Sequence, residues 1–304
     1  MSSHIGFLGL GLMGEPIALN LARAGVPLLV WNRTPERTEP LHAAGATVAA
    51  TADDVFADSE IVIAMLAHAE AIDEVLGRRT PRFTALMRDR TFVHMGTTAP
   101  AYSAALGAEI AAAGGAYVEA PVSGSRVPAQ RGELAGMVAG KPADVARVRP
   151  LLQHVCSEVV ECGAVPNALT TKLAVNIFLI TLVTGLAESF HFAAKSGLDL
   201  AAFARVLDSG PMASAVSRLK LDKLLRQDYS AQAALADVLQ NNVLVREAAA
   251  ASGIATPLIE TCRDLFAEAT QLAIGAEDMV GVVHAHESRT AALHNAARQN
   301  EEER

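Results

Sequence analysis

Two kinds of hydrophobic pattern follow one another along the chain, and the first begins at residue 4. Residues 4–8 form a short apolar run that ends in glycines, and residues 13–24 repeat apolar positions with a period of about 3.6. This helical pattern stops at Gly25, and a second apolar run follows at residues 26–31. The order strand, helix, strand predicts a β-α-β unit with parallel strands and a right-handed crossover.

The same alternation continues to residue 163. Apolar runs alternate with alanine-rich helical stretches such as residues 101–113, which end at Gly114 and Gly115. We expect further strands at residues 61–66, 91–95, 116–119, 136–140 and 158–162. Strands separated by helices are typical of a parallel sheet covered on both faces. The pattern therefore predicts an α/β Rossmann-type domain over residues 1–163.

The second kind of pattern covers residues 164–304 and predicts an all-α domain. Strand-like alternation does not recur there, and helical periodicity is punctuated by glycine and proline. Residues 167–195 read as one interdomain helix of more than about 40 Å, long enough to join the two domains. Two such domains predict an active site in the cleft between them.

The most apolar stretch of that helix, residues 173–187, is interrupted by Asn176, Thr181, Thr184 and Gly185. It falls short of the roughly 20 apolar residues that a spanning helix needs. We therefore expect a buried helix and no membrane partner. A net charge of −8 and a pI near 5.6 also disfavour anionic membranes and nucleic acid as partners.

Length and cysteine content agree with an intracellular two-domain protein. A chain of 304 residues exceeds what one hydrophobic core usually organises, so two domains of about 150 residues are the default. Cys156, Cys162 and Cys262 are an odd number, and residues 1–30 lack a secretory pattern. These features predict a cytoplasmic protein without a disulfide framework.

Two further expectations concern partners and metals. The apolar faces of the C-terminal helices exceed the needs of one small bundle, which predicts a homodimer or homotetramer formed through that domain. His284 and His286 resemble a metal pair, but residues two apart on a helix point about 200° from each other. We therefore predict no metal site.

The first apolar run leads into a glycine-rich turn of the form G-x-G-x-x-G. The turn lies between a predicted strand and a predicted helix, where three glycines permit a tight turn, close approach of a pyrophosphate and helix packing. The helix N-terminus adds free N–H groups and partial positive charge. We predict dinucleotide contacts by Gly9, Leu10, Gly11, Leu12, Met13 and Gly14.

The residues at the end of the second strand bear on the choice of dinucleotide. An NAD-selective fold places a carboxylate about 20 residues after the glycines, to bind the ribose 2′-hydroxyl. This chain has Asn32, Arg33 and Thr34 there, which can all donate to a 2′-phosphate and cannot repel it. We predict that NADP(H) is preferred and that NAD(H) remains possible.

Three motifs together resemble the β-hydroxyacid dehydrogenase family. They are the Gly9–Gly14 turn, the segment Glu-Ala-Pro-Val-Ser-Gly-Ser at residues 119–125 with Gly-Glu-Leu at 132–134, and Lys172 followed by Asn176. That family includes 3-hydroxyisobutyrate dehydrogenases, tartronate semialdehyde reductases and glyoxylate/succinic semialdehyde reductases. The likeness spans nearly the whole chain and implies hydride transfer between nicotinamide and a small hydroxy acid or its semialdehyde or keto acid.

The resemblance also implies residue roles. Ser123 and Gly124, with Ser125 beside them, would hold a substrate carboxylate, and small residues with backbone N–H groups suit an anion. Lys172 would act as the general acid or base if its pKa is lowered, and Asn176 would orient the lysine or the substrate oxygen. Without the motifs, a lone lysine near the start of a helix is typical of a solvated side chain.

Further cofactor contacts follow from the same resemblance, as do departures from the family pattern. Leu66, Ala67 and Thr97 match loops near the dinucleotide, and Asp237 matches a family aspartate. The lysine that usually precedes this aspartate is replaced by Ala236. His94 and Gly96 likewise stand where Asp and Ser are common, so the ribose pocket and the substrate choice can differ from the family.

Two alternatives remain open. Imine reductases share the architecture and the glycine turn, but they usually replace the lysine, so Lys172 argues against them. A cofactor-binding module without turnover is also possible on this fold. Oxidation of NADPH by cyclic imines would favour the first, and binding without oxidation would favour the second.

Overall fold

The computed structural model describes residues 4–302, and the chain divides into two compact units. The first unit ends at Ala174 and the second begins at Val175, so the boundary falls inside the long helix α9 (Asn167–Lys195). The predicted boundary at residue 163 coincides with the end of the last strand. The bounds that the periodicity predicts for this helix, residues 167–195, are those observed.

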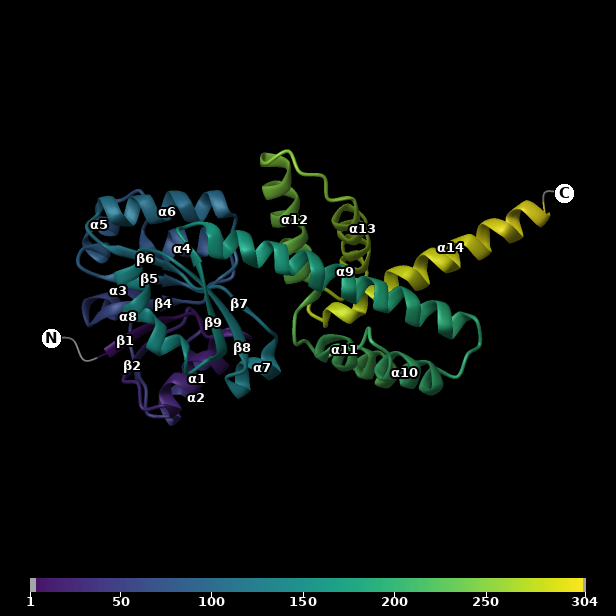
Figure 1. The fold of residues 1–304 in the computed structure, drawn as a ribbon, viewed down its shortest axis with the longest axis horizontal. Helices are drawn as coiled ribbons and strands as arrows, with labels where there is room; N and C mark the ends of the chain where they lie inside the picture. Colours follow the sequence, from purple (N-terminus) through teal and green to yellow (C-terminus); the bar gives the residue numbers. More distant parts are fainter. Residues whose placement is uncertain (1–3, 303–304) are drawn as a thin grey trace. The chain divides into compact units, whose positions relative to one another are not determined.

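The first unit contains one twisted sheet of nine strands in the order β3-β2-β1-β4-β5-β6-β8-β7, with β9 paired to β8 (Figure 1). The pairs from β3 to β6 are parallel, as is β8 with β9, whereas β8 runs antiparallel to β6 and β7. The strands are β1 (His4–Leu8), β2 (Leu28–Trp31), β3 (Thr47–Val48), β4 (Ser59–Ala64), β5 (Thr91–His94), β6 (Ala116–Glu119), β7 (Val122–Ser123), β8 (Leu134–Ala139) and β9 (Cys156–Gly163).

Helices cover both faces of this sheet. They are α1 (Gly14–Arg23), η1 (Pro35–Thr38), α2 (Glu39–Ala43), α3 (Ala52–Ala57), α4 (Ala69–Leu76), α5 (Pro81–Met87), α6 (Pro100–Ala112), α7 (Arg126–Arg131) and α8 (Pro142–Leu152). Successive strand residues point to opposite faces, so Phe7 and Ile63 pack with side chains of α1 and α8, whereas Leu8 and Val62 pack with those of α3 to α6. The doubly covered sheet confirms the predicted Rossmann-type fold.

The second unit is helical throughout its described residues. After the end of α9 it contains α10 (Leu200–Ser209), α11 (Ala215–Arg226), α12 (Leu235–Ala251), α13 (Pro257–Gln271), η2 (Met279–Val282) and α14 (Val283–Glu302). An isolated bridge between Ala234 and Asp278 is the only β-type pairing described beyond α9. This architecture confirms the predicted all-α domain.

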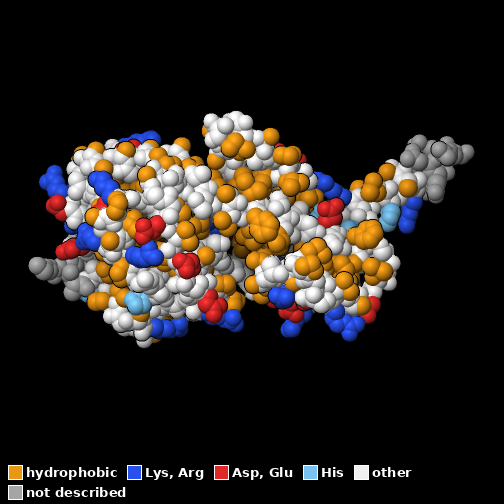
Figure 2. Space-filling model, viewed as in Figure 1, with side chains coloured by type: hydrophobic (Ala, Val, Ile, Leu, Met, Phe, Trp, Pro, Cys, Tyr) orange, Lys and Arg blue, Asp and Glu red, His pale blue; other side chains and the backbone are white. Residues whose placement is uncertain are grey.

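The helix α9 is only partly buried. It is long and apolar enough to cross a membrane by length and composition, with a mean hydropathy of 1.8 over its best 18-residue window, but core helices of soluble proteins pass the same test. Of that window, 39% is buried, and Phe178 and Phe192 are 71% and 69% exposed. The prediction of a buried helix is therefore wrong for this face. Figure 2 shows hydrophobic side chains gathered over the second unit.

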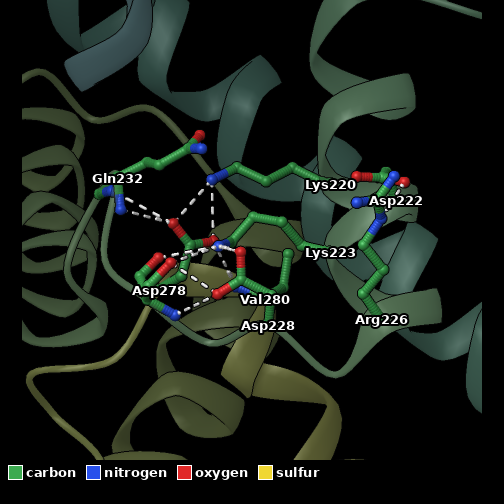
Figure 3. Close-up of polar contacts among 10 residues, drawn as sticks. Lys220, Asp222, Lys223, Arg226, Asp228, Gln232, Asp278 and Val280 are labelled. Atoms are coloured by element: carbon green, nitrogen blue, oxygen red, sulfur yellow. Dashed lines mark hydrogen bonds and ion pairs between the residues drawn. The ribbon is translucent and has the colours of Figure 1, made fainter.

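A buried ion pair ties three segments of the second unit together (Figure 3). The Lys220 ammonium lies 2.8 and 2.9 Å from the two carboxylate oxygens of Asp278, and these side chains are 4% and 0% exposed. The same carboxylate accepts hydrogen bonds from the backbone N–H groups of Gln232, Ala233 and Val280. Asp278 therefore joins α11, the segment before α12 and the start of η2.

Candidate active site

The glycine turn connects β1 to α1, and each of its outer glycines is required by a close contact. Gly9 has a φ of +92°, and a Cβ there would lie 2.4 Å from the carbonyl oxygen of Met65. A Cβ at Gly14 would lie 1.9 Å from the carbonyl oxygen of Gly9. Gly14 therefore lets the first turn of α1 pack directly on the loop.

The middle of the turn is open and fits the pyrophosphate of a dinucleotide. A Cβ at Gly11 would have one neighbour within 4 Å, a guanidinium nitrogen of Arg37 at 3.8 Å. Within residues 4–302, the backbone N–H groups of Gly11, Leu12 and Met13 make no hydrogen bond to the protein. Free N–H groups at a helix N-terminus, beside a guanidinium, are suitable donors for a phosphate anion.

Asn32 holds the turn in place. Its side-chain oxygen accepts a 2.9 Å hydrogen bond from the backbone N–H of Leu10, and its side-chain nitrogen donates a 2.8 Å bond to the carbonyl oxygen of Thr34. The prediction that the Asn32 amide donates to a 2′-phosphate needs correction, because these two bonds use both ends of the amide. The side chain links the end of β2 to the glycine turn.

The cationic end of β2 contains one residue that the sequence analysis missed. Arg33 and Thr34 are exposed, as predicted for groups that meet a ligand. Arg37 in η1 is also exposed and approaches Gly11. Neither arginine has an ion-pair partner in the described part of the chain. The spacing of four residues between two arginines after the second strand is the signal that could have identified Arg37.

The loops after β4 and β5 open at the same edge of the sheet as the glycine turn. Leu66 and Ala67 follow β4, and Thr97 follows β5. Since β1 pairs with β4, and β4 with β5, the carboxyl ends of these parallel strands lie side by side. A Cβ at Gly96 would lie 2.6 Å from the carbonyl oxygen of Leu66, so the two loops are in direct contact.

The predicted carboxylate-binding residues form a short loop after β7. Ser123 ends β7, Gly124 has a φ of +129°, and Ser125 precedes the first residue of α7. The hydroxyls of both serines make no hydrogen bond within the described residues. An ion pair of 3.3 Å between Arg126 and Glu15 attaches α7 to α1. The loop is thereby fixed to the helix that begins at the glycine turn.

Lys172 and Asn176 lie on the buried face of α9, one turn apart. Lys172 is 9% exposed and Asn176 is 3% exposed. Burial lowers the pKa of the Lys172 ammonium to about 8, and no carboxylate counteracts this effect. The side-chain nitrogen of Asn176 has no hydrogen-bond partner among the described residues. A buried amine close to neutral in pKa, beside a free amide, is suited to proton exchange with a ligand oxygen.

Asp237 lies in the second unit, in the first turn of α12, and is exposed there. Ala236 before it is exposed too, so no positive charge replaces the family lysine at this place. The start of α12 is anchored, because Asp278 binds the backbone just before it (Figure 3). The role of Asp237 toward a cofactor stays a prediction.

Comparisons with known proteins agree with this geometry. Residues 4–163 match the family described as NAD binding domain of 6-phosphogluconate dehydrogenase. Residues 167–286 match that described as NAD-binding of NADP-dependent 3-hydroxyisobutyrate dehydrogenase. Glyoxylate/succinic semialdehyde reductase 2 of Arabidopsis thaliana is 30% identical over 282 residues, which cover 92% of this chain and 78% of that protein.

Solved structures show the same relationship. A 3-hydroxyisobutyrate dehydrogenase from Salmonella typhimurium superposes with a TM-score of 0.84 at 26% identity, covering 92% of this chain and 99% of that one. Psf3 in complex with NADP+ and 2-OPP gives a TM-score of 0.85 at 25% identity and the same coverage. An imine reductase from Pseudomonas sp. gives a TM-score of 0.63 at 22% identity over 94% of this chain, which shows a shared fold.

Proposed function

The chain belongs to the β-hydroxyacid dehydrogenase family, and from this we propose that it interconverts a small hydroxy acid and its semialdehyde or keto acid with NADP(H). The observation that carries the proposal is the buried Lys172 ammonium with its lowered pKa, one turn from the unpartnered Asn176 amide. Dehydrogenase and reductase activity on small hydroxy acids is common to the named relatives.

The residues of this chain supply binding and proton transfer. Bound nicotinamide supplies or accepts the hydride. During reduction, Lys172 donates a proton from Nζ to the carbonyl oxygen of the substrate, and during oxidation its neutral amine accepts the hydroxyl proton. Because the pKa of Lys172 lies near 8, both protonation states are accessible near neutral pH. The free amide nitrogen of Asn176 is able to donate to the same substrate oxygen.

The other end of the substrate is proposed to be a carboxylate bound at residues 123–125. The Ser123 and Ser125 hydroxyls have no protein partner among the described residues, and the backbone at Gly124 has a positive φ that exposes its N–H group. Hydroxyl and N–H donors in a loop of small residues can surround an anion. This arrangement favours short, carboxylated carbonyl compounds over large or cationic ones.

A substrate panel tests the proposal. Glyoxylate, succinic semialdehyde, tartronate semialdehyde and cyclic imines are each offered with NADPH, and oxidation is followed by absorbance. We expect turnover with at least one carboxylated carbonyl compound and none with cyclic imines. Turnover of the imines alone would instead favour an imine reductase, and NADPH binding without oxidation of any compound would favour a cofactor-binding module.

The preference for NADP(H) is proposed from Arg33, Thr34 and Arg37. Replacing Arg33 with Asp puts a carboxylate where a 2′-phosphate would bind, so we expect the ratio of kcat/KM for NADPH to that for NADH to fall by about tenfold or more. The control is Arg23→Asp, the same charge change at an exposed arginine in the last turn of α1. An unchanged ratio in the Arg33 variant would remove this assignment.

Self-association is proposed from the second unit, as a homodimer or homotetramer. Phe178 and Phe192 lie four turns apart on α9, and such large exposed apolar side chains are usual at subunit interfaces. We expect sedimentation at micromolar concentration to show a species of at least two chains, and Phe178→Asp to shift it toward monomer. Val160→Asp, at an exposed valine of β9, is the control. A wild-type monomer at that concentration would contradict the proposal.

A further inference from the structure

A chain of buried polar side chains runs through the first unit and ends at the first turn of α9. Its members are His94, Ser103, Tyr117 and Glu119, which the mechanism above does not use. Three of them are fully buried, and Tyr117 is 7% exposed. His94, Tyr117 and Glu119 come from the neighbouring strands β5 and β6, and Ser103 comes from α6.

The contact with α9 is made by Glu119. One carboxylate oxygen accepts hydrogen bonds of 3.1 and 3.2 Å from the backbone N–H groups of Ala168 and Leu169. Helices leave their first N–H groups without an intrahelical partner, so a carboxylate there satisfies two of them and stabilises the first turn. Lys172 follows Ala168 by four residues and therefore lies on the same face, one turn further along.

The other carboxylate oxygen of Glu119 is held by the rest of the chain. Ser103 donates its hydroxyl proton to this oxygen in a short contact. The Ser103 oxygen lies 2.6 Å from the Tyr117 hydroxyl, which lies 2.8 Å from Nδ1 of His94. Since a hydroxyl has one proton, Tyr117 donates to Ser103, and Nδ1–H of His94 donates to Tyr117. An ionised Glu119 therefore fixes the direction of every bond.

The histidine is neutral at the far end. Burial lowers the pKa of His94 to about 4, so the ring carries one proton near neutral pH. The bond directions place that proton on Nδ1, and Nε2 has no partner among the described residues. A Cβ at Gly96 would lie 3.3 Å from this nitrogen, so the chain ends directly beneath the loop after β5. His94 and Gly96 are both departures from the family pattern, and they are neighbours here.

We propose that Glu119 is a positioning residue for Lys172, with its carboxylate fixing the first turn of α9 and itself held by the hydrogen-bond chain through Ser103 and Tyr117 to His94. The inference rests on the proposed role of Lys172. A shift of about 1 Å in a catalytic group can lower a rate by about 100-fold, so a fixed first turn matters for proton transfer. The reach of Glu119, rather than its charge, is what this role requires.

Two conservative variants separate reach from charge. Glu119→Gln keeps the length, and its amide oxygen can still accept from Ala168 and Leu169. Glu119→Asp keeps the charge but is one methylene shorter, so it cannot contact both the α9 backbone and Ser103. We expect kcat of the Asp variant to fall by about 10-fold to 100-fold and that of the Gln variant to stay within about 3-fold, with KM for NADPH unchanged in both.

Two measurements on the protein without cofactor are independent of activity. Amide hydrogen exchange at Ala168 and Leu169 is expected to quicken in the Asp variant and to stay slow in the Gln variant. The Gln amide donates to Ser103, which reverses the chain and moves the His94 proton to Nε2, a change that 15N chemical shifts of the imidazole report. Glu158→Asp, at an exposed glutamate of β9, is the control.

The outcomes are distinct. Slow amide exchange together with near-normal kcat in the Gln variant, and loss of both in the Asp variant, supports the proposal. Wild-type kcat in the Asp variant, or loss of kcat while Ala168 and Leu169 remain protected, overturns it. If the wild-type protein turns over no substrate, the proposed function fails, but the exchange rates and the His94 tautomer still decide whether Glu119 fixes the first turn.

Discussion

Replacing Lys172 with alanine is expected to lower kcat by about two or more orders of magnitude and to leave the affinity for NADPH nearly intact. Alanine removes the group that exchanges a proton with the substrate oxygen, whereas the glycine turn and the arginines after β2 are untouched. Steady-state kinetics with the best compound of the panel, and NADPH titration by fluorescence, measure the two effects. Lys195→Ala, in the exposed last turn of the same helix, is the control.

The pH dependence belongs to the same experiment. Reduction needs the protonated ammonium, so kcat/KM for reduction is expected to fall as pH rises through about 8, and that for oxidation to fall as pH drops below it. Lys172→Arg keeps a positive charge that does not titrate in this range, so its residual activity should lack this break. Full activity of the alanine variant, or an identical pH profile in the variants, would exclude Lys172 as the acid and base.

Replacing Asp278 with alanine is expected to lower the free energy of unfolding of the second unit by about 3 to 5 kcal/mol. The change leaves the buried Lys220 ammonium without its partner and removes the acceptor for three backbone N–H groups. Lys220→Met should cost less, because Asp278 then keeps those three donors. Urea unfolding followed by circular dichroism measures both variants against wild type.

The control for this prediction is an ion pair on the same helix. Arg226 and Asp222 lie 2.8 Å apart but are 73% and 53% exposed (Figure 3). Asp222→Ala should cost less than about 1 kcal/mol, because solvent screens exposed pairs. Equal effects at Asp278 and Asp222 would show that burial does not set the energy of the Asp278 pair.

The fold was predictable from sequence where local patterns are long. Periodicity gives α9 its observed bounds, and apolar runs predict seven of the strands in the sheet, β1, β2, β4, β5, β6, β8 and β9. The two-residue strands β3 and β7 were not predicted, because two residues are too short to show alternation. The antiparallel pairing of β8 with β6 was also missed, because tertiary packing decides strand direction.

The candidate site divides in the same way. The glycine turn and the Lys172–Asn176 spacing are local signals, and the structure places these residues in a turn and on one helix face. Glu119 was missed because its partners on α9 are 49 and 50 residues away along the chain. The amide of Asn32 was assigned to a ligand because its bond to Leu10, 22 residues away, leaves no local pattern.

That bond between Asn32 and Leu10 constrains how cofactor selectivity can be redesigned or can drift. A residue at the end of β2 that seems free to vary with the nucleotide is also a strut for the turn in front of α1. Substitution at Asn32 would loosen both the adenosine end and the diphosphate end of the dinucleotide site at once. Evolution toward NADH is therefore open at Arg33 and Arg37 and closed at the asparagine beside them.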